Sequence, residues 1–229
     1  MIKHLACIMD GNRRWARQRG ILPWYGHRRG AETVRVAIDF CLEHAIEHLS
    51  LYAFSLENFK RPAQENEYLF QLLAQEIKAV QVECEKLHVR ICFIGDRTLF
   101  PTSLVNLCDQ LEERTASFDR MQLNVLFCYG ARSEIVSAVK KIATKISAGQ
   151  LSEQDLSPEL IEEHLWTSGI PAPELIVRTG GARRLSNFLL YQAAYSELYF
   201  LDCLWPDLTK EHLQNAVTYF HSCRRNFGT

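Results

Sequence analysis

Arginine is concentrated in one short stretch near the start of the chain. Residues 10–35 contain seven arginines and only two acids, Asp10 and Glu32, and they follow an apolar run that ends at Met9. If that run is a strand and a helix begins just after Asp10, free backbone N–H groups face the strand end, where phosphate is the natural ligand. The alternative is that Asp10 caps the helix and the arginines cover a solvated face.

Asp10 adds a second constraint to this arginine-rich stretch. A lone carboxylate beside bound phosphate would repel it unless a divalent cation lies between the two. Mg²⁺ held by one carboxylate and by diphosphate oxygens satisfies this condition. The stretch therefore predicts a diphosphate site that uses Mg²⁺, in which His27 could donate to phosphate or instead cap the following helix.

A second basic segment lies near the other end of the chain. Residues 178–187 hold Arg178, Arg183 and Arg184 with two glycines and no acid, directly after an apolar run. Glycine lets backbone approach a ligand, and arginine grips phosphate oxygens bidentately. We therefore predict a second, separate anion site, the alternative being a surface turn with solvated arginines. Glu197, inside an apolar run, needs one of these arginines or a metal as its partner.

Polar groups also follow the apolar run that ends at Phe54. The segment contains Ser55, Glu57, Asn58, Phe59 and Arg61. Its position at a strand end favours a binding role, whereas its residue types alone are equally typical of loop and capping chemistry.

Alternating elements must position these segments. The expected strands are His4–Met9, His48–Phe54, Val89–Ile94, Leu123–Cys128, Glu174–Val177 and Leu198–Phe200, and the expected helices are Ala31–His44, Glu65–Leu87, Leu104–Ser117, Ser133–Ile146, Pro158–Trp166 and Lys210–Cys223. Such alternation predicts an α/β fold with a mostly parallel central sheet flanked by helices, formed by residues 1–229 as one domain. Ligands of these sheets bind beyond the carboxyl ends of the strands.

Global composition narrows the class of partner and the compartment. Lys and Arg number 26 against 27 acids, so the net charge of -1 gives no reason to expect nucleic acid. Eight cysteines without a C-x-x-C pair indicate buried thiols in a reducing compartment. No secretion signal or membrane span is visible, and we expect a cytoplasmic protein.

The helix Glu65–Leu87 is apolar on more than one face, which core packing or the wall of a hydrocarbon cavity would explain.

Several motifs, in order along nearly the whole chain, resemble those of the cis-prenyltransferases of the undecaprenyl diphosphate synthase type. They are His4–Ala16, Gly26–Gly30, Leu51–Pro62, Arg178–Gly181 and Ser186–Leu190. The resemblance implies a homodimer that extends an allylic diphosphate, usually farnesyl diphosphate, by cis condensation with isopentenyl diphosphate. Its product would be a polyprenyl diphosphate such as undecaprenyl diphosphate, a lipid carrier for cell-wall glycans. An apolar tunnel between sheet and helices would hold the chain, and product release would involve transient contact with a membrane.

The resemblance also implies residue roles. Asp10 would bind Mg²⁺ and assist departure of the allylic diphosphate, Asn58 would take part in proton removal, and Glu197 would provide a second Mg²⁺ position. The substrate-contacting set would be Gly11, Asn12, Arg13, Arg14, Trp15, His27, Ser55, Leu56, Glu57, Phe59 and Arg61, with Arg178, Arg184, Leu185 and Ser186 at the isopentenyl diphosphate site.

Six positions depart from the family's pattern, namely Arg13, Pro23, Cys128, Ala131, Ala182 and Asn226. If the resemblance holds, the property that these departures put in question is the affinity of the site for isopentenyl diphosphate. An inactive polyprenyl-diphosphate-binding or accessory subunit is therefore the alternative to an enzyme. A soluble phosphatase or nucleotide-binding protein would need a phosphate loop or a G-x-G-x-x-G turn, and the sequence contains neither.

Overall fold

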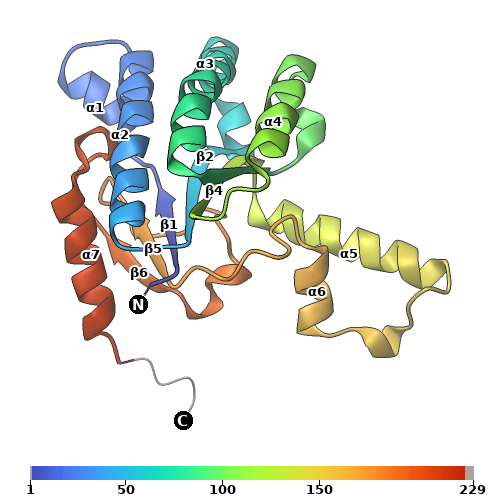
Figure 1. Cartoon of the computed structure of the whole chain (residues 1–229). Helices are drawn as coiled ribbons and strands as arrows, with labels where there is room; N and C mark the ends of the chain where they lie inside the picture. The colour runs from blue at the N-terminus through green and yellow to red at the C-terminus, as the bar shows by residue number, and fades with distance from the viewer. Residues whose placement is uncertain (1, 225–229) are drawn as a thin grey trace.

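The computed structural model describes residues 2–224, apart from the side chains of residues 78–80. Strands and longer helices alternate along it as expected (Figure 1). The strands are β1 (His4–Ile8), β2 (His48–Ser55), β3 (Val89–Ile94), β4 (Met121–Tyr129), β5 (Leu175–Arg178) and β6 (Glu197–Phe200). The α-helices are α1 (Asn12–Gln18), α2 (Pro23–Glu43), α3 (Ala63–Leu87), α4 (Thr102–Thr115), α5 (Ala131–Ser147), α6 (Pro158–His164) and α7 (Lys210–Ser222). Short 3₁₀ turns include η1 (Leu56–Lys60), η4 (Gln192–Tyr195) and η5 (Trp205–Asp207).

The six strands form one parallel sheet in the order β3-β4-β2-β1-β5-β6. The order places β1 at the centre, between β2 and β5, although β5 follows β1 by some 170 residues. Because all strands are parallel, their carboxyl ends lie along one edge of the sheet. The predicted α/β fold with a parallel sheet flanked by helices is confirmed.

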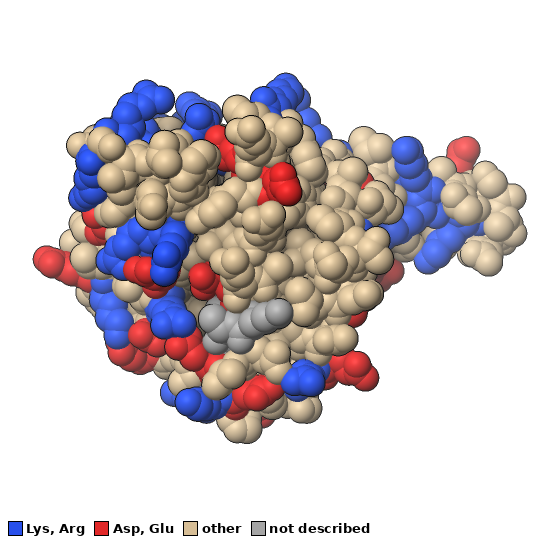
Figure 2. Space-filling view, turned by 90° about the horizontal axis from the view of Figure 1, so that it is seen from above, with Lys and Arg blue, Asp and Glu red and all other residues tan. Residues whose placement is uncertain are grey.

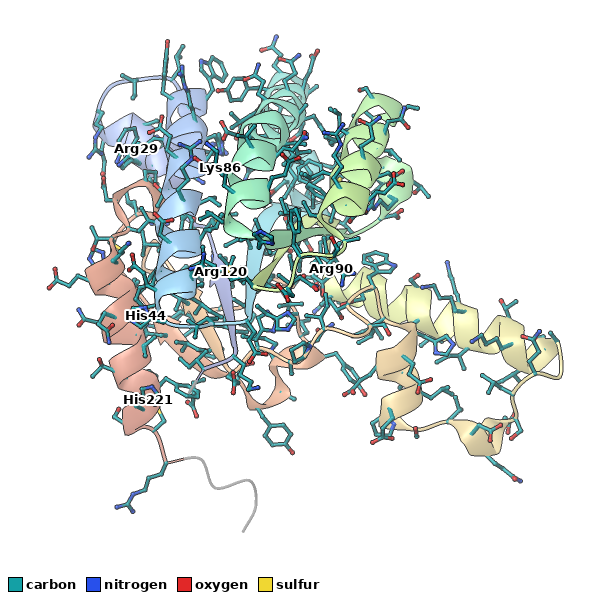
Figure 3. The ribbon with its side chains drawn as sticks, viewed as in Figure 1. Arg29, His44, Lys86, Arg90, Arg120 and His221 are labelled. Carbon is teal, nitrogen blue, oxygen red and sulfur yellow. The ribbon has the colours of Figure 1, made fainter. Side chains whose placement is uncertain are left out.

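Alternate residues of the strands face two different hydrophobic layers, as the period of a strand requires. Leu5 and Cys7 of β1 belong to the layer covered by α2, α3, α4 and α7, whereas Ala6 and Ile8 belong to the layer covered by the start of α5 and by the chain after β5. The helices on the first layer also contact one another. Figure 3 shows His44 at the end of α2 beside α7, where its Nε2 lies 2.9 Å from Oε1 of Gln214.

The chain differs from the expected boundaries mainly in α2. This helix begins at Pro23, eight residues before the predicted start, because proline is favoured at the first helical position, where no backbone N–H is needed. His27 is therefore inside a helix and does not cap one, which corrects the capping alternative.

All eight cysteines are free, and five of them are buried. Burial raises the pKa of the Cys7 thiol to about 12, so this side chain packs as a neutral apolar group. Three others, Cys92, Cys203 and Cys223, are only partly buried. Within residues 2–224, no helix combines the length and the apolar character that crossing a membrane requires.

Candidate active site

A basic pocket lies over the carboxyl end of β1. Its walls come from the turn after β1, from α1, from His27 of α2 and from Arg61 after β2. The lining residues are Met9, Asp10, Gly11, Asn12, Arg13, Arg14, Arg17, His27 and Arg61. Four arginines and one aspartate make the local field strongly positive, as the sequence predicts for a phosphate site. Viewed from above, Lys and Arg gather mainly on the side of the molecule where α1 lies (Figure 2).

Gly11 sets the geometry of the turn between β1 and α1. Its φ of +115° lies in the left-handed region, and an added Cβ would come within 3.0 Å of the Cα of Leu204. Glycine alone accommodates both conditions without strain. The turn therefore brings Asp10 and the arginines of α1 over the strand end.

Asp10 joins the two basic segments. Its Oδ2 accepts a hydrogen bond of 2.9 Å from Nη2 of Arg178, and its Oδ1 lies 3.2 Å from Nη2 of Arg14. The Asp10 side chain is 31% exposed, whereas Arg178 is 5% exposed. The anion sites that the sequence suggests as separate therefore share one carboxylate, because β1 and β5 are neighbours in the sheet.

Arg178 also organises the loop that follows β5. Its Nη1 donates to Oγ of Ser186 at 2.7 Å and to the backbone oxygen of Arg184 at 2.5 Å, while its buried Nε has no partner among the described residues. Ser186 and Asn187 both adopt positive φ, at 51° and 64°. Such conformations cost energy in non-glycine residues and persist where the surroundings hold them, typically at functional sites. The loop is thus held in one shape beside Asp10.

Gly180 allows this loop to approach α1. Its φ is +83°, and an added Cβ would lie 2.3 Å from Nη2 of Arg14. The buried Thr179 next to it donates from Oγ1 to the backbone oxygen of Asp10 at 2.7 Å. The segments after β1 and β5 therefore form one continuous surface.

A buried acid that the sequence analysis did not single out lies behind the basic pocket. Oε1 of Glu65 is 3.3 Å from Nε2 of His27, 3.4 Å from Nη1 of Arg61 and 3.5 Å from Nε of Arg13. Glu65 follows Arg61 at the i,i+4 spacing of a helical ion pair, and this spacing was the signal available in the sequence. Burial, and secondarily the Arg61 charge, lowers the pKa of His27 to about 4, so this ring is neutral at neutral pH.

The residues after β2 form a capped 3₁₀ turn at the edge of the site. Oδ1 of Asn58 accepts from the backbone N–H of Ser55 at 3.1 Å. Glu57 reaches the loop after β5, where its Oε1 accepts from Nδ2 of Asn187 at 2.8 Å. Leu56 is partly buried against the core, and Phe59 packs against Phe54 with ring centroids 5.1 Å apart. The capping alternative is therefore present in the structure, together with a link to the second basic segment.

Three residues assigned by resemblance lie away from the pocket of this chain. Trp15 points toward η5, where its Nε1 donates to Oδ1 of Asp207 at 2.7 Å. Leu185 packs into the hydrophobic layer on the other face of the sheet. Glu197 begins β6 level with Leu175, three residues and roughly 10 Å before the strand end that carries Arg178. It is only partly buried, and its assignment to a second Mg²⁺ position stays a prediction.

The departures from the family's pattern fall into different environments. Pro23 is the first residue of α2, and Ala131 is the first residue of α5. Cys128 is buried with a φ of 50°, a conformation that asparagine tolerates better than cysteine. Ala182 is part of the loop after β5, and Asn226 lies outside the described residues.

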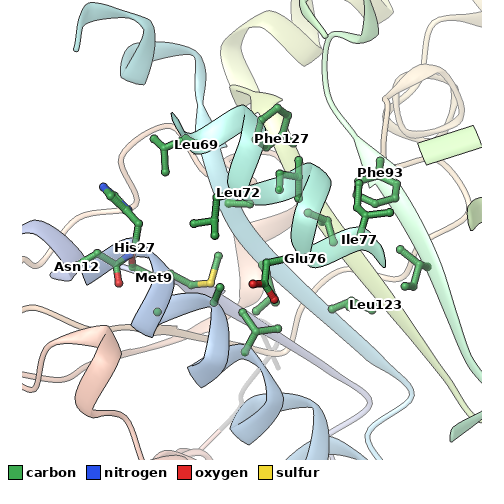
Figure 4. Close-up of a pocket in the computed structure, with 18 of the residues that line it drawn as sticks. Met9, Asn12, His27, Leu69, Leu72, Glu76, Ile77, Phe93, Leu123 and Phe127 are labelled. Carbon is green, nitrogen blue, oxygen red and sulfur yellow. The ribbon is translucent and has the colours of Figure 1, made fainter. Parts of the chain in front are cut away.

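An apolar cavity continues from the basic pocket. It shares Met9, Asn12 and His27 with that pocket and runs between the sheet, α2 and α3 (Figure 4). Its volume is about 150 Å³. Its other walls are Gly30, Ala31, Val34, Leu51, Ala53, Leu69, Leu72, Leu73, Glu76, Ile77, Ile91, Phe93, Leu111, Leu123, Val125, Phe127 and Trp205. An apolar cavity of this size in another protein stays dry and takes apolar ligands.

A cationic pocket at the carboxyl ends of parallel strands, opening into an apolar cavity, defines an α/β enzyme that acts on phosphorylated apolar substrates. Comparison with known proteins gives the family. The family described as "Putative undecaprenyl diphosphate synthase" matches residues 8–228. The chain belongs to this family of cis-prenyltransferases, and it is a prenyl-transferring enzyme of the class that condenses isopentenyl diphosphate with an isoprenoid diphosphate.

Individual relatives are similar over almost the whole chain. An undecaprenyl-diphosphate synthase of Pyrococcus abyssi named as geranylgeranyl-diphosphate specific is 42% identical, with 99% of this chain and 86% of that protein aligned. One from Photorhabdus laumondii named as farnesyl-diphosphate specific is 43% identical, over 99% of this chain and 89% of that protein. The crystal structure of lavandulyl diphosphate synthase from Lavandula x intermedia with dimethylallyl diphosphate superimposes with a TM-score of 0.97 at 31% identity, covering 100% of this chain and 98% of that one.

Proposed function

We propose that the enzyme extends farnesyl diphosphate by repeated cis condensation with isopentenyl diphosphate to a polyprenyl diphosphate such as undecaprenyl diphosphate, a lipid carrier for cell-wall glycan synthesis. The observation that carries this proposal is the junction at Asp10, where the basic pocket, the loop after β5 and the entrance of the apolar cavity meet. In this proposal the allylic diphosphate binds at the junction, isopentenyl diphosphate binds beside it at the loop after β5, and the hydrocarbon tail enters the apolar cavity.

The arginines divide between the two substrates in this proposal. Arg13, Arg14, Arg17 and Arg61 bind the allylic diphosphate in the pocket over β1. Arg178 shapes the loop after β5, in which Arg184 and Ser186 bind isopentenyl diphosphate.

The reaction requires the site to stabilise the negative charge that develops on the departing diphosphate. The C–O bond of the allylic diphosphate breaks, and its electron pair leaves with the diphosphate. The double bond of isopentenyl diphosphate supplies the new C–C bond, and one proton is then lost. Fixed cationic groups stabilise the charge that develops on the leaving group, and the shared junction holds both substrates in reacting geometry. The role of Asn58 in proton removal stays a prediction.

The residues at the site fit Mg²⁺ as a cofactor. The described residues contain no group of three or more His, Cys, Asp and Glu side chains that could enclose a metal. Mg²⁺ commonly binds through one or two carboxylates together with substrate phosphates and water, and the partly exposed Asp10 carboxylate provides that single ligand. When bound, the ion would neutralise charge on the departing diphosphate. Asp10 is the first metal ligand in this proposal, and Glu197 is proposed as a second Mg²⁺ position.

Three further parts of the proposal concern the whole protein. We expect a homodimer, a cytoplasmic location and transient peripheral membrane contact when the long product leaves. The presence of apolar side chains on the exposed side of α5, such as Val136 and Val139 at 52% exposure, is compatible with contact to a second copy.

The test of the proposed function is incorporation of labelled isopentenyl diphosphate into product, measured with farnesyl or geranylgeranyl diphosphate as primer. We expect activity that requires Mg²⁺ and that falls on the order of 100- to 1000-fold in Asp10→Ala, since a charge-stabilising group is lost. Asp39→Ala, on the exposed face of α2, is the matched control. Absence of product with every allylic primer, despite binding of the primer, would instead indicate an inactive lipid-diphosphate-binding subunit.

A further inference from the structure

Asn187 lies where three connections of the sheet meet. It belongs to the loop after β5, and it contacts both the start of α5, which follows β4, and η1, which follows β2. In the order of the sheet, β1 and β2 separate β5 from β4, so this loop crosses the carboxyl ends of two strands before it reaches α5. The function proposed above gives Asn187 no role, although it directly follows Ser186.

Asn187 caps the start of α5. A helix begins with backbone N–H groups that lack a partner within the helix, and Gly130 at the cap position of α5 has no side chain to satisfy them. The backbone oxygen of Asn187 accepts from the N–H of Ala131 at 2.9 Å, and its Oδ1 accepts from the N–H of Arg132 at 2.9 Å. A Cβ added at Gly130 would lie 2.7 Å from Nδ2 of Asn187. The glycine therefore leaves room for this side chain, and one loop residue satisfies the first two N–H groups of the helix.

The other end of the Asn187 amide binds η1. Its Nδ2 donates to Oε1 of Glu57 at 2.8 Å, so the amide uses its acceptor on α5 and its donor on η1. The φ of Asn187 is +64°, in the left-handed region, which asparagine adopts more readily than most residues. This backbone conformation aims the amide between the two elements, and the two hydrogen bonds in turn hold the backbone in it.

The residues before Asn187 are those that the proposed function assigns to isopentenyl diphosphate. Oγ of Ser186 accepts from Nη1 of Arg178 at 2.7 Å and from Nε of Arg184 at 3.2 Å. Arg178 thus holds Ser186 from the side of β5, and Asn187 holds the next residue from the side of β2 and β4. Because Arg184 is exposed, its position depends on how firmly these two attachments hold the loop.

We propose that Asn187 is a positioning residue for isopentenyl diphosphate, which acts through Ser186 and Arg184 and not by touching the substrate. The inference rests on the proposed function, because it takes this loop as the binding site of that substrate. Without the hydrogen bonds of the Asn187 amide, the loop samples other conformations, and the diphosphate binds only the fraction that has the right one. The allylic site is affected less, because η1 keeps its own capping box and the packing of Phe59 against Phe54.

Three variants test this role. Asn187→Asp keeps the size of the side chain and an oxygen for the N–H of Arg132, but it places a carboxylate against that of Glu57. The double variant Asn187→Asp with Glu57→Gln restores a hydrogen bond between these two positions, with donor and acceptor exchanged. Asn187→Gly removes the side chain and tolerates the left-handed backbone, so it provides a second comparison should the charged variant not fold. Asn106→Asp, on the exposed face of α4, is the matched control.

Steady-state kinetics with Mg²⁺ measure KM for isopentenyl diphosphate and KM for farnesyl diphosphate separately. Asn187→Asp should raise KM for isopentenyl diphosphate on the order of tenfold and change KM for farnesyl diphosphate less than about twofold. The double variant should recover most of this loss, and Asn106→Asp should match the wild type. An unchanged KM for isopentenyl diphosphate, an equal rise for both substrates or no recovery in the double variant overturns the proposal.

Trypsin cleavage after Arg184 tests the same positioning without substrate, so it separates this proposal from failure of the proposed function. It is followed by mass spectrometry at a temperature at which the melting curves show every variant folded. Cleavage should be on the order of tenfold faster in Asn187→Asp than in the wild type, and the double variant should return toward the wild-type rate. Equal rates in the wild type and Asn187→Asp contradict the role of Asn187 even if neither protein makes product. Faster cleavage in a protein that makes no product supports the hold of Asn187 on the loop and counts against the proposed function alone.

Discussion

Arg178 shows how much of the site depends on one side chain. The two terminal nitrogens of this buried guanidinium donate to Asp10, Ser186 and the backbone oxygen of Arg184. Its rigid planar fork spreads the donors over two nitrogens and so reaches all three acceptors, whereas the donors of a lysine ammonium all come from one atom. The position of Asp10 is therefore determined jointly by its own turn and by a residue far along the chain.

His27 provides a pH-dependent test at the residue scale. Its ring binds a proton below about pH 4 in the folded chain, whereas the usual value of 6.5 applies when the chain unfolds. The unfolded state binds more protons between these values, so the free energy of unfolding falls as the pH is lowered through this window. The contribution of His27 is about 2 kcal/mol between pH 7 and pH 5.

When the pH is lowered from 7 to 5, we expect the free energy of unfolding to fall in both proteins. The fall should be about 2 kcal/mol smaller in His27→Gln than in the wild type. The measurement is urea unfolding at several pH values without ligand. His4, which is also buried and has its pKa lowered to about 4, continues to contribute in both proteins. His221→Gln, near the end of α7, is the control, and an identical pH dependence for His27→Gln and the wild type would show that His27 does not titrate as the buried geometry requires.

At the scale of elements, the site depends on how closely α1 packs against α2. A Cβ added at Gly26 would lie 2.0 Å from the backbone oxygen of Asn12, and one at Gly30 would lie 2.3 Å from Oδ1 of the same residue. The backbone oxygen of Gly30 also accepts from Nε1 of the buried Trp205 at 2.8 Å. Two glycines in α2 thus let the start of α1 rest directly on that helix, and α1 carries the arginines of the basic pocket.

Gly26→Ala tests the contact between α1 and α2, because the change in stability has opposite signs with and without tight packing. Helix propensity alone predicts stabilisation of about 1 kcal/mol, whereas overpacking against backbone predicts a net loss of roughly 1–3 kcal/mol. We expect a lower melting temperature and weaker binding of farnesyl diphosphate, because α1 must move. Gly149→Ala has open space around it but a left-handed φ of +71°, so it should lower the melting temperature through backbone strain and leave farnesyl diphosphate binding unchanged, which controls for destabilisation alone. A more stable Gly26→Ala protein would contradict the packing argument.

The element boundaries illustrate what local patterns can predict. Short apolar runs locate all six strands, because a strand buried on both faces is apolar over consecutive residues. The local pattern does not predict the start of α2, since Trp24, Tyr25 and His27 give no clear helical stripe and Pro23 is the single local indication. The strand predicted over Leu198–Phe200 is confirmed as β6, which begins one residue earlier at Glu197.

At the scale of the whole molecule, α5 and α6 extend from the body while the sheet forms its centre (Figure 1). The base of α5 is fixed by Glu134, whose carboxylate is completely buried. It accepts from the backbone N–H of Thr167 at 3.0 Å and from Nε2 of Gln192 at 3.0 Å. The distal end of α5 and the following residues 148–157 are largely exposed.

This contrast predicts how the chain opens. We expect the amides of the central strands and those around Glu134 to exchange with solvent together, through global unfolding, while residues 148–157 exchange faster through local opening. Hydrogen exchange followed by mass spectrometry of peptides measures both. Separate exchange of β3-β4-β2 and β1-β5-β6 would argue against the prediction that the chain is one domain.

The sequence by itself determined the class of fold, the strand ends that carry polar residues and the basic character of both segments, because composition and periodicity are local properties. Only the tertiary structure decided which of these segments meet. β1 and β5 are neighbours, so Asp10 contacts Arg178, and α3 packs over the sheet so that Glu65 contacts His27 behind the basic pocket and Glu76 lines the apolar cavity. Strand order and helix packing depend on contacts between residues far apart in the chain, and no local pattern contains that information.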